Sequence, residues 1–171
     1  MRKAAYLLVI FSLIFASSCS GGKTKKENIS LSAGELLSVE EASEITGYEL
    51  IQSENTKTRA RFDSDPIGKD PVILELYSYN GSNSVAKIYE MFKDKKDKRP
   101  SAEDISGMGA EAFIAYPSVT FYRDGYMVVV TAGSGADDVQ AELLKKLAQK
   151  ASEHLDEYLK NNPTDSDILK Q

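Results

Sequence analysis

The sequence has no tryptophan, one cysteine and one histidine in 171 residues. One cysteine excludes a scaffold of disulfide bonds, and one cysteine with one histidine supplies too few ligands for the usual zinc site. The histidine, His154, lies on the flank of a helical stripe and is interpreted as a surface residue. Nucleophilic catalysis that depends on a histidine base is therefore not expected.

The chain also lacks a strong excess of charge of one sign. Its formal net charge is −5, with 42% hydrophobic and 27% charged residues, which is an ordinary globular balance. This composition excludes a disordered acidic chain and a membrane protein with many spans. An acidic body without a dense basic face also argues against nucleic acid as a partner.

The first residues have the pattern of an export signal. Arg2 and Lys3 precede an apolar run from Ala4 to Ala16 that is interrupted only by Ser12. A run of this length suits the apolar part of a signal peptide, whereas a membrane-spanning helix needs about 20 apolar residues. The sequence therefore predicts a signal peptide over residues 1–18 that is cleaved after export.

The cysteine stands directly after this signal. The stretch Ala16-Ser17-Ser18-Cys19 resembles the bacterial lipobox, although lipoboxes prefer leucine where this chain has Ala16. The resemblance implies cleavage before Cys19 and a diacylglycerol on its sulfur, which anchors the protein to a membrane without a span. An ordinary cleaved signal that leaves a free thiol is the alternative.

The lipobox resemblance implies an extracytoplasmic protein anchored by lipid to a membrane. In a host with one membrane this is the outer face of the plasma membrane. In a host with two membranes it is the outer membrane, since Ser20 is not the aspartate that retains lipoproteins at the inner membrane. Loss of Arg2 and Lys3 with the signal would change the net charge from −5 to −7.

Composition divides the rest of the chain into three parts. Residues 19–34 are rich in glycine, serine and lysine and are expected to form a flexible tether behind the lipidated cysteine. Residues 35–160 have the length of one domain and no internal repeat, and residues 161–171 form a polar tail.

Helix and strand signals alternate in the first half of this domain. Ser38 and Glu41 have the spacing of a capping box at a helix start, and Gly47 is a left-handed stop. Residues 50–62 predict a pair of short strands around a turn near Glu54-Asn55. A better strand over 72–79 alternates apolar and mixed residues, and a helix is expected to begin after Ser82 or Ser84.

The second half contains the clearest local signal. Asp124-Gly125 separates two alternating runs, 118–123 and 126–131, and such a dipeptide favours a tight hairpin. The register of this hairpin places Phe121 opposite Val128 and Val119 opposite Val130. A long amphipathic helix follows Gly135 and ends near Asn161.

This order predicts an α+β fold, in which an antiparallel sheet of hairpins and meanders packs with about three helices. The stretch Ile105-Ser106-Gly107-Met108-Gly109-Ala110-Glu111-Ala112, followed by a hairpin and a terminal helix, resembles a pattern in small bacterial lipoproteins of unknown function. Some of these are similar in outline to PsbP-like domains. The resemblance implies a sheet between helices and no catalytic residue.

Three short motifs are interpreted as structural. Gly107-Met108-Gly109 lacks the parallel strand and following helix of a dinucleotide site, and Gly133-Ser134-Gly135 precedes acids that would repel phosphate. Asp63-Ser64-Asp65 resembles the start of a calcium loop, but Ile67 and Leu74 stand where ligands are required. No cofactor, metal site or catalytic residue is therefore predicted.

Tyrosines gather in the strand half of the domain, and Tyr77, Tyr79 and Tyr122 are the predicted interaction surface. Together with the anchor, they predict a non-enzymatic module that binds an envelope protein or a small ligand. The alternatives are a carboxylate-dependent hydrolase of envelope polymers and a structural or assembly subunit.

Overall fold

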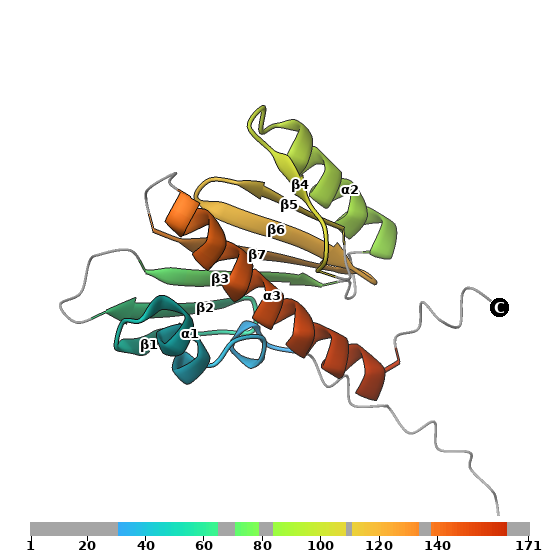
Figure 1. Ribbon diagram of the computed structural model, residues 1–171. Coiled ribbons are helices and arrows are strands. Elements are labelled where there is room, and N and C mark those ends of the chain that lie inside the picture. The colour runs from blue at the N-terminus through green and yellow to red at the C-terminus, as the bar shows by residue number, and fades with distance from the viewer. Residues whose placement is uncertain (1–30, 65–70, 79–83, 109–110, 134–137, 164–171) are drawn as a thin grey trace, which may run out of the picture.

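A seven-stranded antiparallel sheet forms the centre of the molecule. The computed structural model describes residues 31–64, 71–78, 84–108, 111–133 and 138–163. The strands are β1 (Leu50–Asn55), β2 (Arg59–Ser64), β3 (Val72–Ser78), β4 (Glu103–Ile105), β5 (Glu111–Ala115), β6 (Ser118–Arg123) and β7 (Tyr126–Ala132). Their order across the sheet is β1-β2-β3-β7-β6-β5-β4 (Figure 1).

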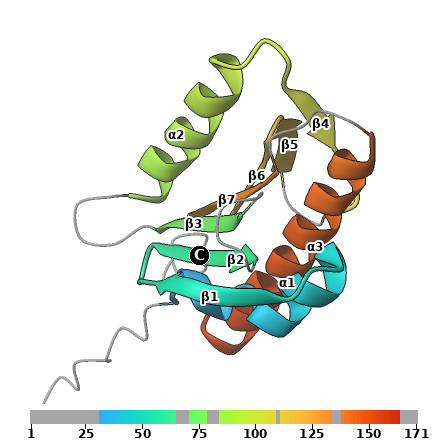
Figure 2. The same cartoon turned by 90° about the vertical axis from the view of Figure 1, so that its left-hand side faces the viewer.

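Helices cover both faces of this sheet. The helical elements are η1 (Ala33–Glu35), α1 (Val39–Thr46), α2 (Val85–Asp97) and α3 (Asp138–Asn161). Figure 2 shows α1 and α3 on one face and α2 on the other. The α+β prediction, with its long C-terminal helix, is confirmed.

The main core lies between the sheet and the face formed by η1, α1 and α3. Alternate residues of each strand point into it, which is the periodicity of a pleated strand. The fully buried side chains of this core include Phe62, Leu74, Val119, Phe121, Val130, Leu144, Leu147 and Leu155. In a chain of this length, burial of a core of this size can stabilise the fold without a metal ion or a disulfide.

A smaller core lies on the opposite face, beneath α2. Ile88 and Phe92 of α2 are buried there against Phe113, Ala115 and Met127 of the sheet. The phenyl rings of Phe92 and Phe113 lie 5.4 Å apart between centroids, in a tilted arrangement. The β5-β6-β7 half of the sheet therefore has an apolar surface on both faces, one in the main core and one in the smaller core.

Local signals set the starts of α1 and α2, the end of α1 and the 124–125 hairpin as predicted. Ser38 caps α1, its hydroxyl accepting from the amide of Glu41 at 3.2 Å, and Gly47 ends the helix at φ 73°. Ser84 caps α2 in the same way, accepting from Lys87 at 3.1 Å. The 124–125 hairpin has the predicted register, with Phe121 opposite Val128.

The turn between β1 and β2 lies at residues 56–58, and the prediction of a turn near Glu54-Asn55 is wrong because both residues belong to β1. A register shift between Gln52 and Glu54 lengthens β1, and Thr56 closes the turn through hydrogen bonds with Arg59. A bulge of this kind inserts an extra residue into one strand, so the alternation of apolar and polar residues does not show where that strand ends. The edge strand β4 was also not predicted, because it has three residues.

Candidate functional site

The predicted tyrosine surface is half-buried where the structure describes it. Tyr77 on β3 and Tyr122 on β6 pack against the smaller core beneath α2, and Tyr79 lies outside the described residues. The ring of Tyr122 lies 4.9 Å from that of Tyr89, and its hydroxyl accepts from the amide of Gly125 at 3.2 Å. Burial raises the pKa of the Tyr77 and Tyr122 hydroxyls. Packing beneath α2 accounts for both rings.

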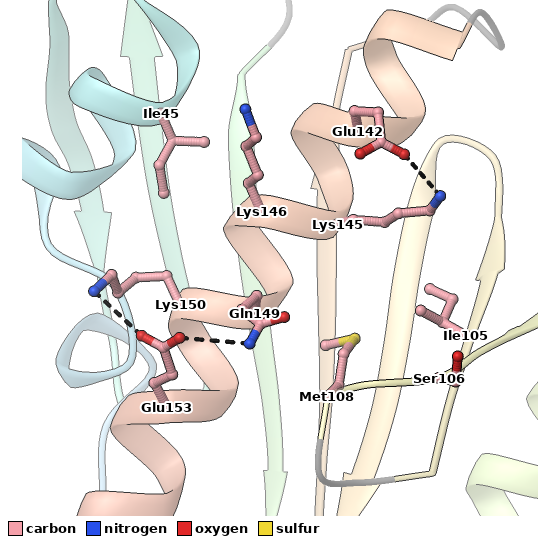
Figure 3. Close-up of a pocket in the computed structure, with 10 residues that line it drawn as sticks. All are labelled: Ile45, Ile105, Ser106, Met108, Glu142, Lys145, Lys146, Gln149, Lys150 and Glu153. Atoms are coloured by element: carbon pink, nitrogen blue, oxygen red, sulfur yellow. Dashed lines mark hydrogen bonds and ion pairs between the residues drawn. The ribbon is translucent and has the colours of Figure 1, made fainter.

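A hollow follows the outer side of α3, and we call it the α3 groove (Figure 3). Its volume is about 420 Å³. Ile45 of α1 lines it on one side of α3, and Ile105, Ser106 and Met108 line it on the other, as Figure 3 shows. The α3 side chains in it are Glu142, Lys145, Lys146, Gln149, Lys150 and Glu153.

The base of the α3 groove is fixed by a buried contact. The hydroxyl of Ser152, which is 2% exposed, donates to the backbone carbonyl of Met108 at 3.0 Å. This bond ties α3 to the segment between β4 and β5, so the Met108 side chain is held beside the helix. A site on two connected elements keeps its geometry better than one on a free loop.

The charges of the α3 groove are partly paired. Lys145 bonds to Glu142 at 2.9 Å, and Lys150 lies 3.3 Å from Glu153. The hydrogen bond between Lys145 and Glu142 lowers the pKa of that carboxyl and raises the pKa of that ammonium. Lys146 has no hydrogen-bond or ion-pair partner among the residues that the structure describes, and Figure 3 shows its side chain on the α1 side without a drawn contact. One exposed cation is thus open to an incoming anion.

His154 joins α3 to the N-terminal elements near this groove. Its Nε2 lies 2.9 Å from Oε1 of Glu41 on α1, and its Nδ1 lies 3.3 Å from the backbone carbonyl of Glu35 in η1. Burial opposes the ionisation of Glu41, but hydrogen bonds from Ser38 and the charge of His154 outweigh it and lower the pKa of the carboxyl. The surface residue expected from the sequence therefore forms an inter-element junction.

The weak motifs of the sequence do not come together as a site. Asp63 is buried and accepts hydrogen bonds from Arg61 and from the hydroxyl of Ser53, while residues 65–70 of the calcium-like loop lie outside the described residues. Gly107 and Gly133 have φ of 87° and 70°, as turn glycines do, and their motif partners Gly109 and Gly135 lie outside the described residues. Cys19 also lies outside them.

The described part of the chain has neither a cluster of metal ligands nor a helix suited to span a membrane. Within residues 31–64, 71–78, 84–108, 111–133 and 138–163, no group of three or more histidine, cysteine, aspartate or glutamate side chains could hold a metal ion. Over the same ranges no helix combines the length and the apolar character that crossing a membrane requires.

Comparison with known proteins yielded one structural likeness. No family model and no curated protein matches the chain. A crystal structure described as a GTP-binding regulator from Thermotoga maritima aligns with 71% of this chain and 93% of its own, at 17% identity and a TM-score of 0.37. A likeness at this TM-score carries no argument for fold or function.

Sequence reasoning missed the α3 groove because its walls come from segments far apart in the chain. Ile45, Ile105 and Lys146 meet only after α3 has packed across the sheet. The available signal was the pair Lys145-Lys146 followed by Lys150 on the polar side of the predicted terminal helix. Chemically, the groove offers an exposed cation together with aliphatic side chains, which suits a segment that carries an acidic group beside an apolar one.

Proposed function

We propose that this protein is an extracytoplasmic lipoprotein, anchored through Cys19, whose domain binds a segment of a partner protein in the α3 groove. The observation that carries the binding role is the exposed ammonium of Lys146 in a groove that the aliphatic side chains of Ile45 and Ile105 also line. The anchor rests on the lipobox resemblance at residues 16–19.

The openness of the α3 groove favours a protein segment over a small molecule. Glu142, Lys146, Gln149 and Glu153 line it from the solvent side of α3, whereas a small-molecule site buries most of its ligand's surface. The partner lies along the outer side of α3 and is recognised by its chemistry, an acidic side chain next to aliphatic ones.

The two carboxylates in the α3 groove define this chemistry further. Glu142 and Glu153 flank the lysines, so a ligand with many adjacent negative charges would meet repulsion. They also favour binding over carboxylate catalysis, because each is engaged by a lysine at 2.9 Å or 3.3 Å. A hydrolase would use one carboxyl that is free to give or take a proton.

The anchor is tested by intact-mass analysis and membrane fractionation of the protein made in a bacterial host that processes lipoproteins. We expect a mature chain that begins at Cys19, has the mass of a diacylglycerol adduct, and fractionates with membranes. Cys19→Ala should abolish the adduct and the membrane association. A wild-type chain with an unmodified thiol would refute the anchor.

The groove is tested by site-specific photocrosslinking in the native host. A photoreactive amino acid at Gln149 should give a discrete adduct with one partner, and the same amino acid at Lys57, in the β1–β2 turn, should not. Lys146→Glu should reduce the adduct by about tenfold, since a like charge then faces the acidic segment. Lys160→Glu is the matched control on the same helix outside the groove, and an equal loss there would refute the assignment.

A further inference from the structure

The two ring nitrogens of His154 both face acceptors. Nε2 faces a carboxylate oxygen of Glu41 at 2.9 Å, and Nδ1 faces the Glu35 carbonyl at 3.3 Å. A neutral imidazole has one N–H and can satisfy one of these acceptors, whereas the protonated ring donates to both. The junction is therefore complete when the ring is charged.

Glu41 is shared between this ring and the α3 groove. Its Oε1 lies 2.9 Å from His154 and 3.9 Å from Nζ of Lys150, a residue that lines the groove. Its Oε2 accepts from the amide of Ser38 at 3.0 Å, which holds the carboxylate in place at the start of α1. A change of charge on His154 thus changes the environment of Lys150.

The other charges around the ring are few in the described part of the chain. On its own helix Lys150 and Glu153 precede it and Glu157 follows at the i+3 position, and Lys150 lies 3.3 Å from Glu153. The carboxylate of Glu35 in η1 bonds to Ser32 at 2.6 Å and 2.7 Å and is engaged there.

We infer that His154 is a pH-responsive clamp that joins η1 and α1 to α3 and determines whether Glu41 attracts Lys150 away from the α3 groove. When the ring is protonated, it neutralises Glu41, and Lys150 stays with Glu153 at the groove. When the ring is neutral, the charge of Glu41 acts on Lys150. If the proposed function holds, an acidic segment binds more tightly on the acidic side of neutrality.

The clamp also stabilises the fold within a limited pH range. The depressed pKa of Glu41 means that its contribution is present above the ordinary glutamate pKa and is lost as pH falls through the lower folded value. The protonated ring donates to both Glu41 and the Glu35 carbonyl, so loss of its proton removes one of these two hydrogen bonds. The clamp is therefore complete when Glu41 is ionised and the ring is protonated.

Urea unfolding of the whole domain at about pH 5.5 and about pH 8 tests the clamp, with histidine as the titrating group. We compare wild type with His154→Gln, which keeps a donor but does not titrate, and with Glu41→Gln, which keeps the capping-box geometry. Between about pH 5.5 and about pH 8 the unfolding constant of wild type should rise by about fivefold more than that of either variant. The expected difference is this small because the side chains of His154 and Glu41 are partly exposed, at 33% and 25%. Equal pH profiles in wild type and His154→Gln would overturn the inference.

Side-chain NMR of the lysine Cε–Nζ groups tests the link to Lys150. Its signal should move over the same pH range in wild type and remain constant in His154→Gln, with Lys145 as the control that does not move in either. Movement of Lys150 that is identical in both proteins would overturn the link. Neither measurement needs a partner, so absence of any crosslinked adduct from Gln149 would count against the proposed function and leave the clamp standing on its own results.

Discussion

Replacing Asp63 with asparagine should destabilise the domain by removing a charge that three groups hold in place. Nε of Arg61 donates to both carboxylate oxygens at 3.0 Å, and Nη2 lies 2.9 Å from Oδ1. The hydroxyl of Ser53 on the neighbouring strand donates to Oδ2. The side chain of Asp63 is 6% exposed, whereas that of Arg61 is 33% exposed.

These contacts set the expected magnitude. A hydrogen bond to a charged group contributes about 1.5–3 kcal/mol, and the exposure of Arg61 reduces the value of the pair, so we expect a loss of about 1–2 kcal/mol at neutral pH. Urea unfolding followed by circular dichroism should show the midpoint lowered by about 0.5–1 M, given the usual slopes for a small domain. The asparagine side chain has the size of the aspartate and keeps an acceptor for Ser53, so the change isolates the charge.

The pH dependence of this loss has a definite sign. Hydrogen bonds from Arg61 and then from Ser53 outweigh burial and lower the pKa of Asp63. The stabilising contribution is therefore present above the unfolded aspartate pKa of about 3.9 and disappears as pH falls through the lower folded value. The difference between wild type and Asp63→Asn should shrink below about pH 4.

A matched control is the exposed pair of Lys96 and Asp104, which are 2.5 Å apart with Asp104 73% exposed. Asp104→Asn should change stability by less than about 0.5 kcal/mol, since exposed ion pairs contribute little. Equal midpoints for wild type and Asp63→Asn at neutral pH, or a difference that persists undiminished at about pH 2, would refute the reasoning about Asp63.

Three further changes test other contacts by the same unfolding assay. Phe92→Ala should cost about 3–4 kcal/mol because the ring is 3% exposed in the smaller core, and Phe92→Leu should recover much of this loss. Gly47→Ala should cost about 1–2 kcal/mol through backbone strain alone, since φ is 73° and nothing lies within 4 Å of the added methyl; a neutral result would contradict the left-handed cap. Glu41→Ala should be about 1 kcal/mol less stable than Glu41→Gln, because glutamine can still complete the capping box with Ser38; equal stabilities would show that the box contributes nothing.

The features that could be predicted from the sequence depend on neighbours in the chain. Ser38 and Glu41 cap a helix because they are three residues apart, and Asp124-Gly125 forms a hairpin because both residues have positive φ, at 44° and 83°. Each of these is a property of a short segment and its dihedral angles, so the surrounding fold does not need to be known. The burial of alternate residues in β3 is of the same kind.

The features that could not be predicted depend on distant partners. His154 and Glu41 are 113 residues apart, and no spacing rule connects them. The alternation of residues in the strands predicts on which face of the sheet Tyr77 and Tyr122 lie. It does not predict that α2 covers that face. The α3 groove is of this kind as well, since its walls belong to α1, to the end of β4 and to the segment after it.

Strand β3 lies between β2 and β7, and this position has a consequence for synthesis. Its outer neighbour β2 comes just before it in the chain, but its other neighbour is β7, whose residues 126–132 pair with Val72–Ser78. A polypeptide that emerges from its N-terminus first therefore presents an incomplete half-sheet until almost the entire domain has followed. Unpaired strand edges can pair with those of other chains and cause aggregation. We therefore expect a chaperone that binds the nascent chain during this interval to reduce its aggregation.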